Sequence, residues 1–498
     1  MATKSEENNE SNKNLEALLQ WAAEMGISDS PTCPSSSSSC LGRSLFVSTF
    51  PNAGGRGLAA ARDLKKGELV LRVPREALLT SDGVMKDEKI ACCVKRHPYL
   101  SNTQILTVCL LAEVGKGRGS RWYPYLVELP RCYHTLANFL RFETQALQVE
   151  EAIWVSEKAV LTSKLDWEIA TVVMRELDLK SQLLTLRSWL WASATITSRT
   201  LHIPWDEAGC LCPVGDLFNY AAPDEEIYSE DDTSLKCNGT MEQPDAELLE
   251  CYSQRLTDGG YEDDTASYCF YARENYEKGK QVLLSYGTYT NLELLEHYGF
   301  ILDVNPNEKA FIRLDIDSQK FSSWPKEFLY IHPDGSPSFA LLCTLRLWAT
   351  PAKLRRSVGH RAYSGSLLSA ENELFIMKWL ANHCQNILGQ LPTTLENDEL
   401  LVVIIDKMLD YSSYQKCIDL LSSDRELNKF FQNYGLLKEG TADYSLSPKV
   451  KKSLERWRLT VQWRCNHKKI LVNCVSYCNS VVDRVSSDRD FSKRMGYI

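Results

Sequence analysis

The chain has 498 residues and a formal net charge of −9. This length exceeds what one ordinary core requires, so two or three domains are expected. Hydrophobic residues make up 44% of the sequence, yet no apolar run approaches the roughly 18 residues of a membrane-spanning helix, which predicts a globular protein without a membrane span. The acidic balance excludes the global positive field of sequence-independent nucleic-acid binding, so a macromolecular partner is expected to be protein.

The N-terminus is polar and contains three glutamates among its first ten residues. It has neither the apolar core of a secretory signal nor the Arg-rich, acid-poor character of a transit peptide. We therefore expect a cytosolic or nuclear protein, in which the 17 cysteines are reduced thiols rather than disulfides.

The first predicted elements are a helix and several strands. Residues 1–42 predict a polar tail, a short amphipathic helix and a serine-rich connector. From Leu45 onwards, apolar runs punctuated by glycine predict short strands around a turn at Lys65–Gly67, and the second of these strands ends at Pro74.

A helical insert then divides the strand-rich parts of the chain. Residues 85–200 contain long stretches without interior Gly or Pro, with apolar residues at steps of three and four. Sequence patterns typical of strands recur at 210–220 and at 266–287. Between these stretches, clustered Asp and Glu residues at about 224–265 predict a solvated acidic loop.

Helices are predicted from about residue 330 to the end, as a separate all-α domain at about 320–485. Thr393 and Glu396 have the form of a capping box before an apolar run. The nearest approach to a metal-site spacing is the group Cys465, His467, Cys474 and Cys478. These thiols recur with apolar residues at steps of three and four, which favours the buried face of a long helix over a zinc site, so no metal is expected.

Three segments combine glycine, polar and tyrosine residues: GGRGLAA at 54–60, DLFNY at 216–220, and SYGTYTNLELLEHYGF at 285–300. A lone Gly-x-Gly is weak evidence, because glycine commonly serves a turn. In this order, with Ser198-Arg199-Thr200 at the end of the insert, they resemble the SET domain of protein methyltransferases. The similar branch is the one typified by the Rubisco large-subunit lysine methyltransferase, and within it the plant SET-domain-group proteins of unassigned substrate.

The resemblance implies an α+β fold, in which a SET-domain β-fold at 43–300 is split by the helical insert. An all-α substrate-binding domain follows, to which PTTLENDELL at 392–401 is similar. The implied activity is methyl transfer from S-adenosylmethionine to a lysine of a protein substrate other than, or besides, histone.

The resemblance also assigns residues to the cofactor: Gly54, Gly55, Arg56, Arg199, Asn219, Tyr220 and Tyr286. The backbone around the two glycines would cradle the amino-acid end of the cofactor, because main chain can approach closely where a Cβ would collide. Arg199 would lie near the carboxylate, which a guanidinium can bind through two parallel hydrogen bonds. Asn219 would hold the amino group. Tyr220 stands where the family has histidine, and its expected contact with the adenine is made chiefly by its backbone.

Tyr286 matches the closing tyrosine of the SET fold and is the implied catalytic residue. A lysine with a pKa of about 10.4 loses its proton at a cost of roughly 4–5 kcal/mol at pH 7, so the enzyme must favour the neutral amine. Desolvation beside a sulfonium lowers the pKa of that amine, and a tyrosine hydroxyl can orient it. Asp216 and Tyr298 match positions near the substrate channel, although Asp216 also suits a turn. Tyr289 replaces an arginine that is frequent in the branch.

Two alternatives remain open at this point. A histidine acceptor is one, since a relative in this branch methylates histidine and imidazole needs little help to become neutral. The other is a catalytically weak SET-fold module that binds a protein partner, because the Asn-Tyr segment departs from the family's Asn-His.

Overall fold

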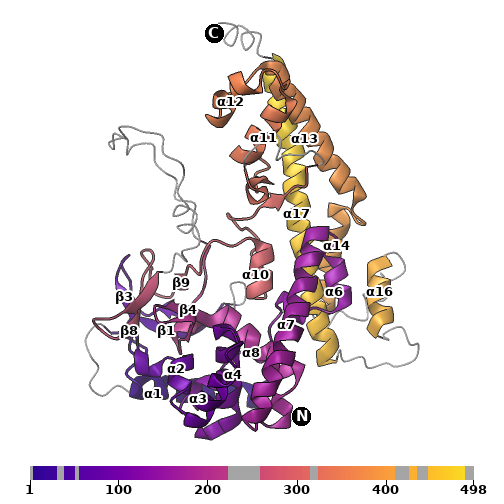
Figure 1. Cartoon of the computed structure of the whole chain (residues 1–498). Helices are drawn as coiled ribbons and strands as arrows, with labels where there is room; N and C mark the ends of the chain where they lie inside the picture. Colours follow the sequence, from indigo (N-terminus) through magenta and orange to yellow (C-terminus); the bar gives the residue numbers. More distant parts are fainter. Residues whose placement is uncertain are drawn as a thin grey trace. The chain divides into compact units, whose positions relative to one another are not determined.

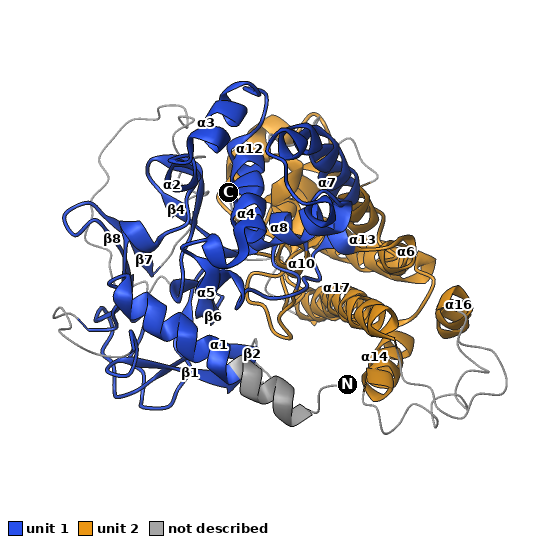
Figure 2. Ribbon diagram, turned by 90° about the horizontal axis from the view of Figure 1, so that it is seen from below, with its two compact units in different colours: residues 1–138, 158–288, 296–299 blue, residues 139–157, 289–295, 300–498 orange. Residues whose placement is uncertain are grey.

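The structure is a computed structural model that describes residues 4–30, 39–50, 55–222, 258–314, 324–409, 425–434 and 447–487, with side chains from residue 12 onwards. Gly54 and most of the expected acidic loop, residues 223–257, lie outside these ranges. The chain forms two compact units (Figure 2), one from residues 1–138, 158–288 and 296–299, and one from residues 139–157, 289–295 and 300–498. These units cut across the boundaries expected from the sequence, because part of the insert belongs to the second unit.

Short strands form the framework of the first unit (Figure 1). The antiparallel pairs are β1 (Leu45–Phe50) with β2 (Gly55–Ala60), β3 (Leu69–Pro74) with β8 (Ser267–Tyr271), β8 with β7 (Gly259–Glu262), and β4 (Thr200–Ile203) with β5 (Asp206–Leu211). The parallel pair is β6 (Asn219–Tyr220) with β9 (Leu283–Leu284). The strand that ends at Pro74 is confirmed. Residues 259–262, expected in the acidic loop, instead form β7, because they pair with β8.

Helices occupy the expected insert, and most of them pack around one apolar core of the first unit, while Ala146 is buried in a core of the second unit. They are α2 (Ser81–Val84), α3 (Glu88–Lys95), α4 (Asn102–Lys116), α5 (Tyr123–Leu126), α6 (Arg141–Ala146), α7 (Glu150–Glu176) and α8 (Leu186–Arg199). The core of the first unit includes the fully buried Trp189 of α8 and Leu106 of α4. The predicted N-terminal helix is longer than expected, at α1 (Lys4–Glu24), and Leu18 on its apolar face is buried in this core.

Residues 279–284 bring the three sequence motifs together within the first unit. The amide of Val282 donates to the carbonyl of Leu58 in β2 at 2.8 Å, while β9 continues this segment alongside β6. The approach requires a glycine at position 57, since a Cβ there would lie 2.5 Å from Asn219 Nδ2. Motifs more than a hundred residues apart thus become neighbours through these pairings.

The second unit is helical apart from one small strand pair, β10 (Ala310–Phe311) with β11 (Tyr330–Ile331). Its helices include α11 (Phe339–Ala349), α12 (Arg355–Tyr363), α13 (Ala370–Gln390), α14 (Leu395–Leu409), α16 (Arg425–Tyr434) and α17 (Pro448–Ser487), while α10 (Asn291–His297) is shared by the two units. The predicted long C-terminal helix is confirmed as α17, with Cys465, Cys474 and Cys478 on its buried face. Within the described ranges, no helix combines the length and apolar character that crossing a membrane requires.

The predicted cap of the 395–409 helix is displaced by one residue. Thr394, not Thr393, accepts the hydrogen bond from the amide of Asn397, at 3.3 Å. The hydroxyl of Thr393 instead donates to Asp398 at 2.7 Å. Because Asp398 is fully buried beside Arg464, this hydroxyl is used to satisfy a buried carboxylate rather than a helix end.

Candidate functional site

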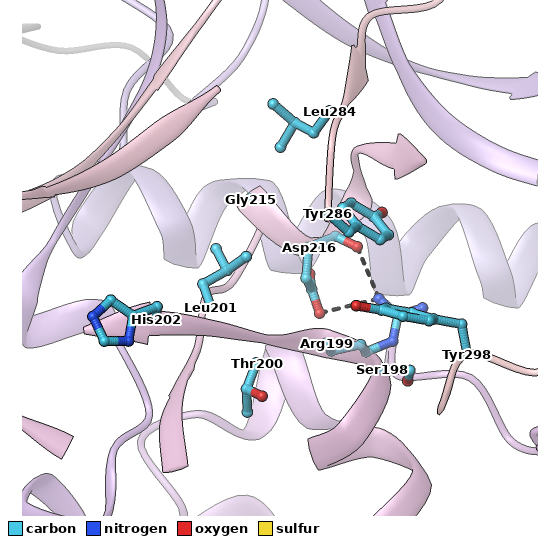
Figure 3. A pocket seen from close by; sticks show the side chains of 10 residues that line it. All are labelled: Ser198, Arg199, Thr200, Leu201, His202, Gly215, Asp216, Leu284, Tyr286 and Tyr298. Atoms are coloured by element: carbon cyan, nitrogen blue, oxygen red, sulfur yellow. Dashed lines mark hydrogen bonds and ion pairs between the residues drawn. The ribbon is translucent and has the colours of Figure 1, made fainter. Parts of the chain in front are cut away.

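A pocket in the first unit gathers side chains from segments distant in the sequence (Figure 3). Its lining residues are Ser198, Arg199, Thr200, Leu201, His202, Gly215, Asp216, Leu284, Tyr286 and Tyr298. They come from the end of α8, from β4, from the turn at Gly215–Leu217, from the end of β9 and from the residues after α10. Four of the residues singled out in the sequence, Arg199, Asp216, Tyr286 and Tyr298, therefore line one pocket.

An ion pair between Arg199 and Asp216 forms one wall of this pocket. Arg199 Nη1 donates to Asp216 Oδ2 at 3.1 Å and to the Asp216 carbonyl at 2.9 Å. The Tyr125 hydroxyl donates to the same carboxylate at 2.7 Å, and Arg199 Nε donates to the Tyr133 hydroxyl at 3.3 Å. Burial lowers the pKa of Arg199, but Asp216, Tyr133 and Tyr125 together raise it by more, so the guanidinium stays charged.

The two tyrosines of this network were not found from the sequence. Tyr125 lies in α5 and Tyr133 follows it, both about 70 to 90 residues before their partners, and neither belongs to a recognisable motif. Burial raises the pKa of Tyr125 well above its ordinary value, and the carboxylate of Asp216 adds to the effect. Tyr125 therefore remains a neutral donor that holds Asp216 in place.

Tyr286 stands between two other tyrosine rings. Its ring centroid lies 5.3 Å from that of Tyr220 and 5.5 Å from that of Tyr298, and it stacks on the latter with an interplanar angle of 28°. Its hydroxyl donates to the Phe218 carbonyl. Burial raises the pKa of Tyr286, so the phenol is un-ionised near neutral pH and keeps its proton for hydrogen bonding.

The side chain of Tyr220 has a role that the family resemblance did not imply. It is buried, and its hydroxyl donates to the carbonyl of Gly287 at 2.8 Å. The larger ring in place of histidine is thus accommodated against Tyr286 and tied to the segment that follows it. Tyr289, two residues further on from Gly287, is not among the residues that line the pocket.

Asn219 and Arg56 meet beside this row of tyrosines. Asn219 Nδ2 donates to the Arg56 carbonyl at 3.4 Å, and Gly57 leaves room for the amide. Gly55 has φ of 79°, a conformation that favours glycine. The side chain of Arg56 turns to Glu128, with which it forms an ion pair and whose carbonyl it contacts at 3.1 Å. The backbone around Gly55 and Arg56 and the amide of Asn219 therefore offer closely spaced polar groups.

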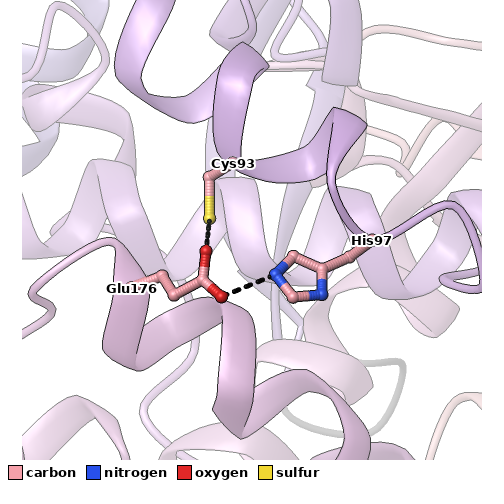
Figure 4. A group of neighbouring side chains, drawn as sticks. All are labelled: Cys93, His97 and Glu176. Atoms are coloured by element: carbon pink, nitrogen blue, oxygen red, sulfur yellow. Dashed lines mark hydrogen bonds and ion pairs between the residues drawn. The ribbon is translucent and has the colours of Figure 1, made fainter.

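One group of described residues offers possible metal ligands, Cys93, His97 and Glu176 (Figure 4). His97 Nε2 lies 2.9 Å from Glu176 Oε1, while the thiol of Cys93 donates to Oε2 at 3.5 Å. Arg96 Nη2 also donates to Oε2, at 2.8 Å, and the Tyr99 hydroxyl lies 2.7 Å from His97 Nδ1. Because the guanidinium of Arg96 balances the carboxylate of Glu176, a hydrogen-bonded network is sufficient to explain why these side chains lie together.

Comparisons with known proteins agree on a single family. Residues 292–471 match the family model for the Rubisco LSMT substrate-binding domain. Over 482 residues the chain is 48% identical to Protein SET DOMAIN GROUP 40 of Arabidopsis thaliana, covering 96% of this chain and 98% of the relative. It is 24% identical to human SET domain-containing protein 4, covering 66% and 73% of the two chains, and 24% identical to mouse actin-histidine N-methyltransferase, covering 70% and 59%.

Solved structures show the same fold. The SET domain of LSMT bound to lysine and AdoHcy matches with a TM-score of 0.55 at 17% identity, over 97% of this chain and 95% of that chain. Rubisco LSMT bound to AdoMet matches with a TM-score of 0.54, also at 17% identity, over 97% and 96%. The fold is that of a SET-domain protein. The chain belongs to the Rubisco LSMT-like branch of the SET-domain family, as a close homologue of the Arabidopsis protein.

Proposed function

We propose that the chain is an S-adenosylmethionine-dependent protein-lysine N-methyltransferase, with Tyr286 as the residue that positions the acceptor. The observation that carries this proposal is the hydroxyl of the half-buried Tyr286, which lines a pocket and lies beside the carbonyl of Phe218. A neutral phenol and a carbonyl together offer the acceptor contacts that a primary amine requires.

The polar groups around Asn219 fit the proposed cofactor. Its amide and the neighbouring backbone of Arg56 offer donors and acceptors for an amino-acid moiety, and Gly57 lets the Asn219 amide approach this backbone closely. Arg199 Nη2 donates to no residue that the structure describes, so it can bind a carboxylate while Nη1 stays on Asp216. When bound, S-adenosylmethionine supplies a methyl group on a positively charged sulfur.

The pocket also supports an amine acceptor on electrostatic grounds. Asp216 attracts a lysine in its charged form, and Arg199 balances this carboxylate so that the amine is not held as an ammonium. The apolar side chains of Leu201 and Leu284 complete the lining and disfavour charge. Tyr286 then holds the neutral amine, whose lone pair is free to take the methyl group.

One experiment tests the activity and the acceptor together. The purified protein is incubated with isotopically labelled S-adenosylmethionine and a lysate of its own source, and the modified residue is found by mass spectrometry. We expect the wild-type protein to transfer the label to a lysine of a protein in the lysate. Tyr286→Phe should keep its fold and its affinity for the cofactor but lose at least about tenfold in turnover, because only the positioning hydroxyl is removed.

The same experiment distinguishes two other functions. Label on histidine would favour the activity named in the actin-histidine N-methyltransferase to which this chain is similar. If nothing is labelled and calorimetry detects no binding of S-adenosylmethionine, the chain is a SET-fold binding module. Unchanged turnover in Tyr286→Phe would exclude the role given to this tyrosine, whichever acceptor is found.

A further inference from the structure

Helix α7 is apolar on two opposite faces. Ala170, Val173 and Met174 lie on the face that packs into the core of the first unit. On the opposite face, large apolar side chains are exposed to solvent: Leu161 by 58%, Leu165 by 49%, Ile169 by 41% and Val172 by 45%. A helix at a solvated surface is expected to be polar on its outer side, and contiguous exposed apolar side chains mark an interaction site.

The outer face of α7 carries a repeating spacing with a charge near each end. Five positions, which we call the α7 seam, follow one another at steps of three, four, three and four residues: Lys158, Leu161, Leu165, Glu168 and Val172. This is the spacing that places side chains in one line along a helix that pairs with another helix. The seam therefore has the periodicity of a helix–helix contact.

The α7 seam is complementary to the α7 seam of a second, antiparallel copy of the helix. A second α7 that runs antiparallel, with the two-fold axis at residue 163, sets Leu161 against Leu165 of the partner helix and Lys158 against its Glu168. Symmetry repeats both contacts, so two apolar and two opposite-charge pairs form at once. The same centre sets Glu151 against Arg175 at the ends of this continuous helix. A parallel pairing would instead oppose lysine to lysine and glutamate to glutamate.

We propose that α7 is a self-association surface, through which two copies of this chain pair by antiparallel contact of their α7 seams. Among possible occupants, a second copy fits because its charges match at both ends. Glu168 also lies 4.0 Å from Lys164 of its own helix, but its side chain is 52% exposed and stays accessible to a second lysine. A partner of a single charge sign would meet one favourable and one unfavourable charge along the seam. One helix pair is a small interface, so the association is expected to be weak and dependent on concentration. The proposal stands independently of any methyl transfer.

Sedimentation velocity across a series of protein concentrations tests the pairing. The full chain should shift from monomer to dimer as its concentration rises through the micromolar range. Leu161→Asp should abolish the shift without changing the melting temperature, since this side chain is exposed and packs on nothing in its own core. A wild-type chain that stays monomeric at the highest soluble concentration would overturn the proposal.

Charge reversals test the antiparallel register. Lys158→Glu and Glu168→Lys should each weaken the dimer by roughly tenfold or more, because each places like charges opposite one another twice. Mixing the two variants should restore association at wild-type strength, since every pair in the mixed dimer is then opposite in charge. Lys451→Glu, the same reversal at an exposed lysine of α17, serves as the control and should change nothing. Failure of the mixture to associate would refute the antiparallel contact.

Discussion

Asp216→Asn removes one negative charge from the pocket while nearly keeping the shape of the side chain. The carboxylate now accepts hydrogen bonds from Tyr125 at 2.7 Å and from Arg199 at 3.1 Å, and its side chain is only 4% exposed. Both bonds go to the same oxygen, Oδ2, so the amide oxygen of asparagine can still accept them, and the substitution mainly removes the negative charge. The charge of Arg199, whose side chain is 21% exposed, is then left without its partner.

The cost of this change can be worked from the geometry. At about 3 Å and an effective dielectric constant of about 20, the Coulomb attraction is roughly 5 kcal/mol, and the desolvation of the two groups offsets much of it. Breaking a fully buried pair costs about 3–5 kcal/mol, and the partial exposure of Arg199 reduces this to roughly 2–3 kcal/mol. The melting temperature of the first unit should therefore fall by roughly 5–10 °C.

Kinetics separate the role of Asp216 in the pocket from its role in stability. With the carboxylate gone, the pocket is net positive and should bind a cationic lysine less well, so KM for the acceptor should rise more than kcat falls. Glu113→Gln is the matched control, because this carboxylate is 4% exposed and pairs with Lys116 at 2.7 Å outside the pocket. It should cost comparable stability and leave KM unchanged. An Asp216→Asn variant with wild-type melting and wild-type KM would refute the ion pair as described.

Three further predictions concern buried polar groups. Tyr220→Phe leaves a buried carbonyl without its donor and should cost about 1–3 kcal/mol in thermal unfolding, and Tyr220→His, which a backbone role alone would tolerate, should cost as much; wild-type melting of both would contradict a side-chain role. Burial raises the pKa of Glu308 to about 7, above its unfolded value of about 4.5, so the free energy of unfolding should fall as pH rises through this window. Glu308→Gln should flatten this pH dependence in thermal melts between about pH 5 and pH 8, and an unchanged slope would contradict the raised pKa. Glu373 is buried against Arg346, so Glu373→Gln should destabilise the chain by roughly 2–4 kcal/mol, while Glu371→Gln at an exposed position of the same helix should change its stability by less than about 0.5 kcal/mol; equal effects of the two variants would refute this distinction.

Local signals account for the elements that could be predicted. Proline ends a strand at Pro74, and the three- and four-residue spacing of apolar side chains along α17 marks its buried face, because both effects act within a few residues. The cap at Thr394 and the burial of Glu373 could not be predicted, since each depends on a residue of another helix: Asp398, to which Thr393 donates, is paired with Arg464 of α17, and Glu373 is paired with Arg346 of α11. The hydroxyl of Thr393 donates a hydrogen bond to Asp398, and the guanidinium of Arg346 donates to Glu373.

The candidate site divides in the same way. Family order identified Arg199, Asp216, Tyr286 and Tyr298, and all of them line one pocket. The hydroxyl of Tyr125 escaped prediction because nothing in its own segment indicates which carboxylate it will meet 91 residues later. The roles of these residues toward a cofactor and an acceptor remain predictions, to be tested by the variants above.

The interleaving of the two compact units in the sequence has a consequence for how the chain is synthesised. Residues 139–157 of the second unit leave the ribosome long before residues 300–498, on which they depend for packing, and the first unit waits for residues 296–299. Domains commonly fold one after another during translation, but these two units are interleaved in the sequence, so the N-terminal unit is not complete until residues 296–299 have been synthesised. A fragment that ends near residue 300 would lack the rest of the second unit and would leave apolar side chains of residues 139–157 exposed. Nascent chains of this protein should thus depend on chaperones until almost the whole sequence has emerged.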